Sequence, residues 1–364
     1  MGTRPTALQR GLRFSLKWGM LGLVPVAIGI HYLAPDRALL LFAASAVAIV
    51  PLAGLMGRAT EVLAHRMGSG IGGILNATFG NAAELIIAIV ALRAGQVEMV
   101  KASITGSIIG NILFVLGLAM LVGGLGHQRQ TFNAQAAGTA ASMMLLAVAA
   151  LILPTFFHLM VREETVRGIQ RLSAGIAVVL LAMYLLSLAF SLKTHKHLYA
   201  EAEVAGEHDA PPRGLAWALA TLAAATVLIA VLSEYLVASA EHAGKALHLS
   251  ETFIGVMVIA VVGNAAEHFT AVLVARKDKM NLAITIAVES SRQIALFVAP
   301  VLVLLGLAIG QPMTLEFSLL EVGAVGVAVL IVNSIAQDGE SNWLEGAMLL
   351  ATYLILAIAF YFLP

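Results

Sequence analysis

Stretches of about 20 apolar residues recur along the whole chain, and they constrain its fold more than any other feature. Each is long enough to cross the hydrocarbon core of a bilayer as a helix. Hydrophobic residues form 60% of the chain and charged residues only 12%, whereas soluble domains carry about 25% charged residues. The stretches do not alternate as transmembrane β-strands do. The sequence therefore predicts an all-α membrane protein.

The apolar stretches predict eleven transmembrane helices. We expect them near residues 17–34, 38–57, 70–93, 99–122, 136–157, 169–191, 214–238, 250–275, 281–309, 315–335 and 343–363. No small-residue cleavage site follows the first, so we interpret it as a retained helix and not as a signal peptide. The polar segment 193–213 contains four acidic residues and Pro211-Pro212, which predicts an acidic cytoplasmic linker between two halves.

An internal repeat indicates how the two halves are related. The pentapeptide GNAAE occurs at residues 80–84 and again at 263–267, an offset of 183. The tripeptide LFV at 113–115 recurs at 296–298 with the same offset. The paired spans lie five places apart in the helix order, an odd number, so the two copies must cross the membrane in opposite directions.

This arrangement predicts two inverted five-helix repeats preceded by one extra helix. The expected units are 1–37 (cytoplasmic N-terminus and extra helix), 38–192 (first repeat), 193–213 (linker) and 214–364 (second repeat). With the N-terminus inside, inner segments hold 13 of the 21 Lys and Arg residues and outer segments hold 7. Because cytoplasmic loops retain positive charge, we expect a multi-pass plasma (inner) membrane protein with a cytoplasmic N-terminus.

Each GNAAE motif places a carboxylate, Glu84 or Glu267, near the middle of a span. A charge there costs roughly 2.5–3.5 kcal/mol unless it has a partner or a polar cavity, and neither motif contains a basic residue. Inverted repeats would bring the two carboxylates together at the midplane. A divalent cation would relieve their repulsion, and protons would replace it when it leaves. The pattern predicts a site for which a cation and protons compete, which is the basis of antiport.

Residues around the two glutamates can supply the oxygen ligands that Ca²⁺ prefers. Gly80 and Gly263 lie one turn before them and are expected to break the helix and free a backbone carbonyl. Six neutral side chains add further oxygens near the acids: Asn81, Asn264, Ser107, Ser290, Ser291 and Gln293. The chain has no cysteine, and its histidines are not spaced as a zinc site requires. We expect no cofactor beyond the transported ion.

Three features leave alternatives open. The GxxxG at 106–110, with Asn111 beside it, is consistent with helix packing or with pathway lining. His268 either hydrogen-bonds a neighbour or relays protons. Glu289 and Arg292 are three residues apart, so they either pair on one helix or place a third carboxylate in the cavity, with a proton or gating role.

Four segments make the chain similar to the calcium/proton exchangers of the calcium/cation antiporter superfamily. They are LNATFGNAAELI (75–86), GNAAEH (263–268), GSIIGNILFVLG (106–117) and SSRQIALFVAP (290–300). The resemblance implies a secondary antiporter that exports Ca²⁺ in exchange for protons by alternating access. It implies Glu84, Glu267 and the carbonyls of Gly80 and Gly263 as metal ligands. It also implies that the pathway is lined by Asn81, Asn264, Ser107, Ser290 and Gln293.

The resemblance also implies that Glu234 lies near a mouth of the pathway, whereas Glu289 and Arg292 depart from the family pattern. A sodium/calcium exchanger would share the paired acids, and a cation channel is a further alternative. An intramembrane enzyme is disfavoured because no HExxH or GxSxG motif occurs. The expected partners are Ca²⁺, protons and the bilayer. A formal net charge of zero gives no sign of nucleic acid, and a homo-oligomer is compatible with the sequence.

Overall fold

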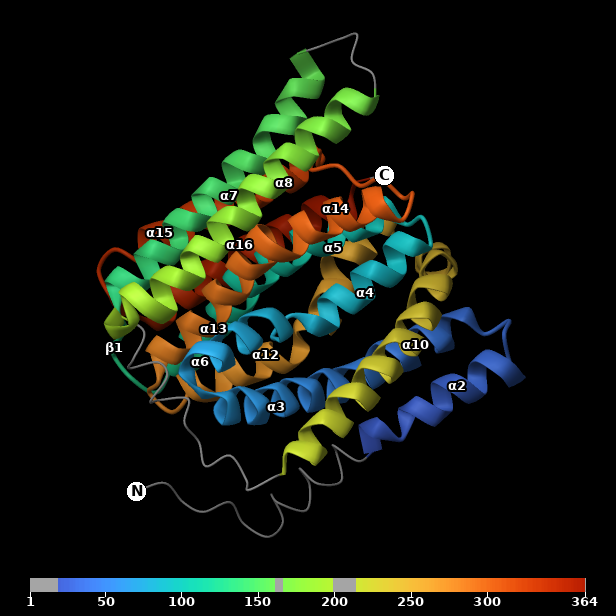
Figure 1. Cartoon of the computed structure of the whole chain (residues 1–364), viewed down its shortest axis with the longest axis horizontal. Helices are drawn as coiled ribbons and strands as arrows, with labels where there is room; N and C mark the ends of the chain where they lie inside the picture. Colours follow the sequence, from blue (N-terminus) through green and yellow to red (C-terminus); the bar gives the residue numbers. More distant parts are fainter. Residues whose placement is uncertain (1–18, 161–165, 199–213, 364) are drawn as a thin grey trace.

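The chain is helical almost throughout the part that the computed structural model describes, which comprises residues 19–160, 166–198 and 214–363 (Figure 1). A helix satisfies its backbone hydrogen bonds internally, as a hydrocarbon environment demands. The α-helices are α2 (Leu23–Leu33), α3 (Ala38–Phe79), α4 (Ala82–Arg93), α5 (Val97–Ile109), α6 (Leu116–Gly124), α7 (Ala134–Met160), α8 (Val166–Ala189), α10 (Leu215–Leu247), α11 (Glu251–Phe253), α12 (Ala260–Ala275), α13 (Met280–Gln293), α14 (Ala299–Ala308), α15 (Leu319–Ile335) and α16 (Trp343–Tyr361). The basic N-terminal residues and the acidic residues of the predicted linker lie outside the described ranges.

Several of these helices are long and apolar enough to span a membrane. Eight segments of the described chain meet this test singly, and the pair Ile71–Phe79 and Ala82–Arg93, bent by 45°, forms a ninth candidate. Two further apolar helices, Gly19–Leu33 and Leu319–Ile335, are shorter. The predicted all-α, multi-span membrane fold is confirmed.

The connection that the sequence predicts over residues 58–69 is helical, because α3 continues through it for 42 residues in all. The chain still folds back on itself in this region. Gly72 lies directly against the backbone carbonyl of Ala64, although residues eight positions apart on a straight helix are separated by about 12 Å. The missing side chain at Gly72 permits this close approach.

Local backbone geometry repeats at the offset of 183 residues found in the sequence. The π-helical segment η1 (Gly110–Val115) joins α5 to α6, and η5 (Ile294–Val298) joins α13 to α14 in the same way. Gly95, after α4, has φ +78°, and its counterpart Asp278, after α12, has φ +59°. Another π-helical segment, η4 (Ile254–Ile259), precedes α12 without a counterpart at that offset, and η2 (Phe190–Thr194) follows α8.

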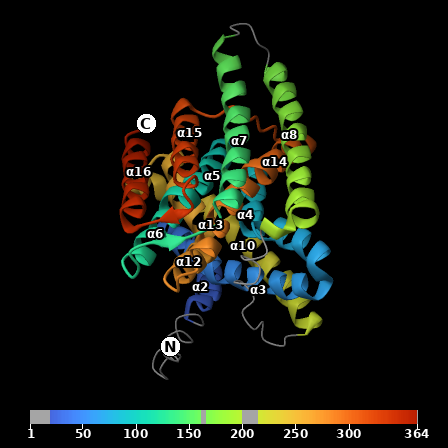
Figure 2. The same cartoon turned by 90° about the vertical axis from the view of Figure 1, so that its left-hand side faces the viewer.

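The helices pack around two apolar cores. In one, α10 packs along α3, and α2 packs on both. The other core joins α5 to α8 with α12 to α16. Figures 1 and 2 show α7, α8 and α15 on the opposite side of the molecule from α2 and α3, with α12 and α13 between them. The residues predicted to bind a cation lie on these intermediate elements and on α4 and α5.

A short two-stranded sheet ties three connections together. Strand β1 (Gln130–Thr131) pairs antiparallel with β2 (Glu340–Ser341). The buried Gln130 amide donates to the carbonyl of Ala275 at 3.0 Å and to Asp278 Oδ1 at 2.9 Å. The end of α12 is therefore fastened to the loop that follows α6 and, through the strand pair, to the start of α16.

We predict that Gly117→Ala destabilises the contact between α6 and α16. A Cβ at Gly117 would lie 2.9 Å from Leu349 Cβ and 3.0 Å from the Gly346 carbonyl oxygen, and such overpacking costs about 1–3 kcal/mol. The unfolding temperature of purified protein in detergent should fall. Gly138→Ala is the matched control, because a Cβ there meets no atom within 4 Å. An unchanged unfolding temperature in Gly117→Ala would show that the contact between α6 and α16 accommodates an extra methyl group without loss of stability.

Candidate cation site

Glu84 lies where the helical path of α3 is interrupted. α3 ends at Phe79 and α4 begins at Ala82, so Gly80 and Asn81 form the turn between them. Glu84 is therefore in the first turn of α4, where the helix dipole favours a negative charge. The helix break expected at Gly80 is confirmed.

Glu267, by contrast, lies in an unbroken helix. Gly263 is inside α12, which runs from Ala260 to Ala275, so the expectation that Gly263 breaks its helix is wrong. Its role in the packing is different: a Cβ at this position would lie 3.0 Å from Glu84 Cγ. Glycine at 263 thus leaves room for the Glu84 side chain to lie against α12.

Because Glu84 lies against Gly263, one helical turn before Glu267 on α12, the two carboxyl groups are close enough for their charges to interact. Glu84 is only 9% exposed, Glu267 is half-buried, and the buried Oε2 atom of each has no hydrogen-bond partner. Two neighbouring anions with unsatisfied oxygens are unfavourable unless a cation or protons neutralise them. Within the described residues no group of three or more acidic, histidine or cysteine side chains is assembled. Additional ligands for a cation would have to be neutral oxygens.

A reciprocal pair of hydrogen bonds joins the two halves beside the glutamates. Ser290 Oγ donates to Asn81 Oδ1 at 3.0 Å, and Asn264 Nδ2 donates to Ser107 Oγ at 3.0 Å. Asn81 and Asn264 are 183 residues apart, and so are Ser107 and Ser290. Each asparagine of one half therefore contacts the serine of the other, and all four side chains are buried.

Asn111 extends this network with three hydrogen bonds of its side chain. Its Nδ2 donates to Asn264 Oδ1 at 3.1 Å and to Ser290 Oγ at 3.0 Å. His268 Nε2 lies 3.0 Å from Asn111 Oδ1, and because this oxygen only accepts, Nε2 is the donor. The geometry therefore supports the hydrogen-bonding role for His268. The sequence leaves packing and pathway lining open for Asn111, a polar residue inside an apolar span, and it gives no indication of the partners that the structure shows.

The remaining predicted pathway residues differ in their placement. Gln293 joins the network, because its Oε1 accepts from Asn81 Nδ2 at 2.6 Å. Ser291 does not: its hydroxyl turns to the Ala287 and Ile108 carbonyls. Glu234 is on an exposed face of α10, next to Tyr235, which stacks on His31.

Glu289 and Arg292 form the predicted ion pair on α13. Arg292 is buried, and its other contact is with Met143 of α7. Glu289 lines a crevice between α7 and α13 together with Asn133 and Asn281. The structure therefore supports the pairing alternative and not a third carboxylate beside Glu84 and Glu267.

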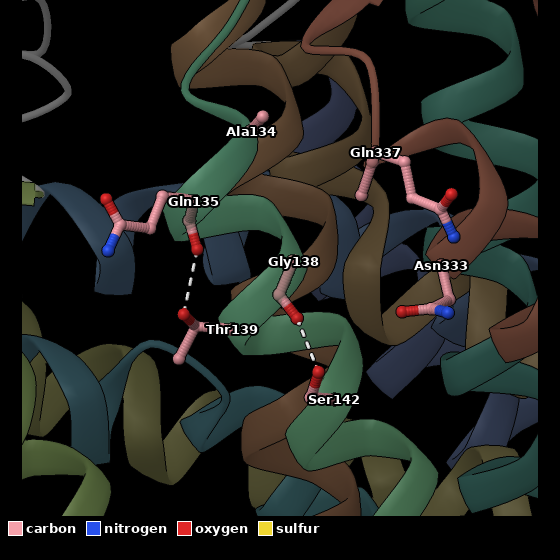
Figure 3. Close-up of a pocket in the computed structure, with 8 residues that line it drawn as sticks. Ala134, Gln135, Gly138, Thr139, Ser142, Asn333 and Gln337 are labelled. Carbon is pink, nitrogen blue, oxygen red and sulfur yellow. Dashed lines mark hydrogen bonds between the residues drawn. The ribbon is translucent and has the colours of Figure 1, made fainter.

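A wider pocket of about 480 Å³ lies between α7 and α15, away from the glutamates (Figure 3). It is lined by Ala134, Gln135, Gly138, Thr139, Ser142, Asn333, Ala336 and Gln337. The two hydroxyl groups are committed to their own helix, because Thr139 donates to the Gln135 carbonyl and Ser142 to the Gly138 carbonyl. With amides and no carboxylate in its lining, this pocket lacks the charge that a divalent cation requires.

The sequence profile of the family described as "Sodium/calcium exchanger protein" matches residues 37–193 and again 217–362. The chain is 47% identical to a Ca(2+)/H(+) antiporter of Aphanothece halophytica, over 95% of this chain and 96% of that protein. It is 50% identical to a Ca(2+)/H(+) antiporter of Synechocystis sp., over 93% of this chain and 95% of that protein.

Solved structures show the same fold. The native YfkE structure matches with a TM-score of 0.81 and 40% identity, covering 96% of this chain and 99% of that one. The structure of the H+/Ca2+ exchanger CAX matches with a TM-score of 0.69 over 95% of this chain and 91% of that one. At 15% identity, the second likeness concerns the fold alone.

The network predicts unequal costs for its two serines. Ser290 contacts both Asn81 and Asn111, whereas Ser107 accepts one bond, from Asn264. At about 1 kcal/mol for each hydrogen bond, Ser290→Ala should lower the free energy of unfolding more than Ser107→Ala, which serves as its matched control. Denaturation of the purified variants measures the difference. Equal losses would indicate that the two serines carry equal shares of the network.

Proposed function

Because this chain belongs to the sodium/calcium exchanger protein family, we propose that it is a secondary antiporter that exports Ca²⁺ from the cytoplasm in exchange for protons. The observation that carries the proposal is the meeting of Glu84 and Glu267, each with a buried oxygen that lacks a partner. The relatives named as Ca(2+)/H(+) antiporters, which are 47–50% identical over nearly the whole chain, support Ca²⁺ and protons as the exchanged ions.

The exchange follows from the chemistry of two adjacent carboxylates. Ionised, Glu84 and Glu267 present two negative charges to one divalent cation, which the oxygen ligands of the site suit. When Ca²⁺ leaves, the two carboxylates repel each other, and this repulsion favours protonation. Each time the site changes access from one side of the membrane to the other, it holds either Ca²⁺ or protons. Uphill movement of Ca²⁺ is therefore coupled to downhill movement of protons.

The neighbouring residues complete this site in our proposal. The carbonyl of Gly80, at the break between α3 and α4, is a candidate ligand. For Gly263 we favour the packing role over a freed carbonyl, since α12 is continuous there. Asn81, Asn264, Ser107, Ser290 and Gln293 line the pathway through the hydrogen bonds described above, and Asn111 and His268 hold them in register. Glu234, on α10, is proposed to lie near a mouth of the pathway.

We further propose eleven spans arranged as one extra helix followed by two inverted repeats. Eight single helices, one bent pair and two shorter apolar helices add up to this number. The family profile matches two segments, 37–193 and 217–362, which are close to the predicted repeats 38–192 and 214–364. The reciprocal Asn–Ser contacts and the matching η1 and η5 segments support the same arrangement. The excess of basic residues on one side favours a cytoplasmic N-terminus in a plasma membrane.

Glu84→Gln and Glu267→Gln should each abolish exchange while the protein still inserts, because one carboxylate cannot balance a divalent cation. Ca²⁺ uptake into everted vesicles under an imposed pH gradient measures this, with Glu340→Gln at an exposed ion pair as the matched control. Uptake that requires sodium instead of the pH gradient would identify a sodium/calcium exchanger. Currents without uphill exchange would identify a channel, and near-normal uptake in either glutamine variant would exclude this site.

The proposed orientation predicts opposite labelling of two exposed loops. The chain contains no cysteine, so single cysteines at Asp36, between α2 and α3, and at Asp338, between α15 and α16, report without background. In intact cells a membrane-impermeant maleimide should label the variant at 36 and spare the variant at 338. Everted vesicles should give the reverse. Labelling of both positions from one side would contradict the proposed topology.

A further inference from the structure

Arg292, which pairs with Glu289, places a full positive charge inside the protein, close to the proposed cation site. Arg292 is 3% exposed, and its Nη2 donates to Glu289 Oε2. Its Nη1 contacts Met143 Sδ at 3.5 Å, and its buried Nε has no hydrogen-bond partner. Glu289 is thus the acidic group that the structure places against this guanidinium.

No other ionised group compensates Arg292 at close range in the contacts described. The titratable group facing the pair from another helix is Tyr184 of α8. Its hydroxyl is committed to the Ala77 carbonyl at 2.8 Å, and its ring stacks on Phe297. Tyr184 therefore positions the end of α3 and contributes no counter-charge to the guanidinium.

The pair shares its helix with residues of the cation site. Ser290 and Gln293 alternate with Glu289 and Arg292 on the same turn of α13, and both contact Asn81. At 100° per residue, Arg292 points to the opposite side of α13 from Ser290, so the charge and the site are separated by about one helix diameter, roughly 10 Å. Across a buried protein interior, a charge at this distance is weakly screened.

Glu289 also lies at a small crevice whose lining includes three polar side chains besides its own carboxylate. It lines the crevice between α7 and α13 with Asn133, Asn281 and Thr285, and its side chain remains 18% exposed against 3% for Arg292. Asn133, at the loop end of this crevice, holds Asn281 Oδ1 through its backbone N–H. The carboxylate can therefore keep partial hydration while the guanidinium is enclosed.

We propose that Glu289 is a specificity-determining residue. Its negative charge cancels the positive charge of Arg292, and this cancellation keeps the guanidinium from raising the electrostatic potential at Glu84 and Glu267. The inference rests on the proposed function of that site. An uncompensated guanidinium would oppose a divalent cation twice as strongly as it opposes a proton, because the interaction scales with the charge of the ion. The pair would then set the balance between the two exchanged ions, beyond any role in holding α13 together.

The test compares Glu289→Gln with the double variant Glu289→Gln/Arg292→Met in everted vesicles. The single variant leaves an unbalanced cation, so the KM for Ca²⁺ should rise at least tenfold with little change in kcat. Because a proton carries half the charge, the pH at which protons half-inhibit uptake should fall by half as many log units as KM rises. The double variant removes both charges and should return to within about threefold of the wild-type KM.

Controls separate charge from structure. Arg292→Lys and Glu289→Asp preserve both charges and should keep the wild-type KM, even if their unfolding temperatures fall. Glu340→Gln removes an acid from the exposed Arg129–Glu340 pair and should leave KM unchanged. Stabilisation of the purified protein by Ca²⁺ reports the same affinities without transport. If Glu289→Gln inserts poorly, this measurement compares the charge-preserving variants with the double variant and the wild type.

Three results would overturn the inference: an unchanged KM in Glu289→Gln, an equal KM increase in the single and double variants, or shifts for Ca²⁺ and protons that do not follow the ratio of their charges. The inference and the proposed function fail in distinguishable ways. If the wild-type protein shows neither pH-driven Ca²⁺ uptake nor stabilisation by Ca²⁺, the proposed function fails before any variant is compared.

Discussion

The approach of Glu84 to Glu267 is the constraint on which the surrounding structure depends. Two carboxylates in an apolar interior can coexist only where the protein supplies polar neighbours and an exchangeable positive charge. The turn at Gly80–Asn81 brings one of them to a helix start, and the bare backbone at Gly263 makes room for it. The buried asparagines and serines then surround the two acids with polar side chains. These side chains carry no net charge, and they still tolerate a charged neighbour.

The hydrogen-bond network is symmetric where the sequence repeats and asymmetric where it does not. Asn81 and Asn264 each hydrogen-bond the serine of the opposite half, although Asn81 accepts from Ser290 and Asn264 donates to Ser107. The counterpart of Asn111 at an offset of 183 is Ile294, and that of His268 is Leu85, so the Asn111–His268 bond exists once. Two related halves therefore produce a network with unlike sides.

Much of this could be predicted from the sequence because two of its signals are physical. Apolar length predicts helices, and a repeated motif with a buried acid predicts where two helices meet. The path of the chain through residues 58–69 could not be predicted from the sequence. The helix continues there, and the chain then folds back through a contact between Gly72 and Ala64 that only the structure shows. The continuity of α12 at Gly263 was missed for a related reason: a glycine signals backbone freedom or close packing equally well, and only its neighbours decide between them.

The strand pair formed by Gln130 and Ser341 has a mechanical consequence. Gln130 holds the last carbonyl of α12, the helix that carries Glu267, and its strand neighbour leads directly into α16. A shift of α12 along its axis must therefore either strain these hydrogen bonds or move two loops with it, one from each half of the chain. Glu267, one of the two proposed cation ligands, is in this way mechanically coupled to the loops that surround the end of α12.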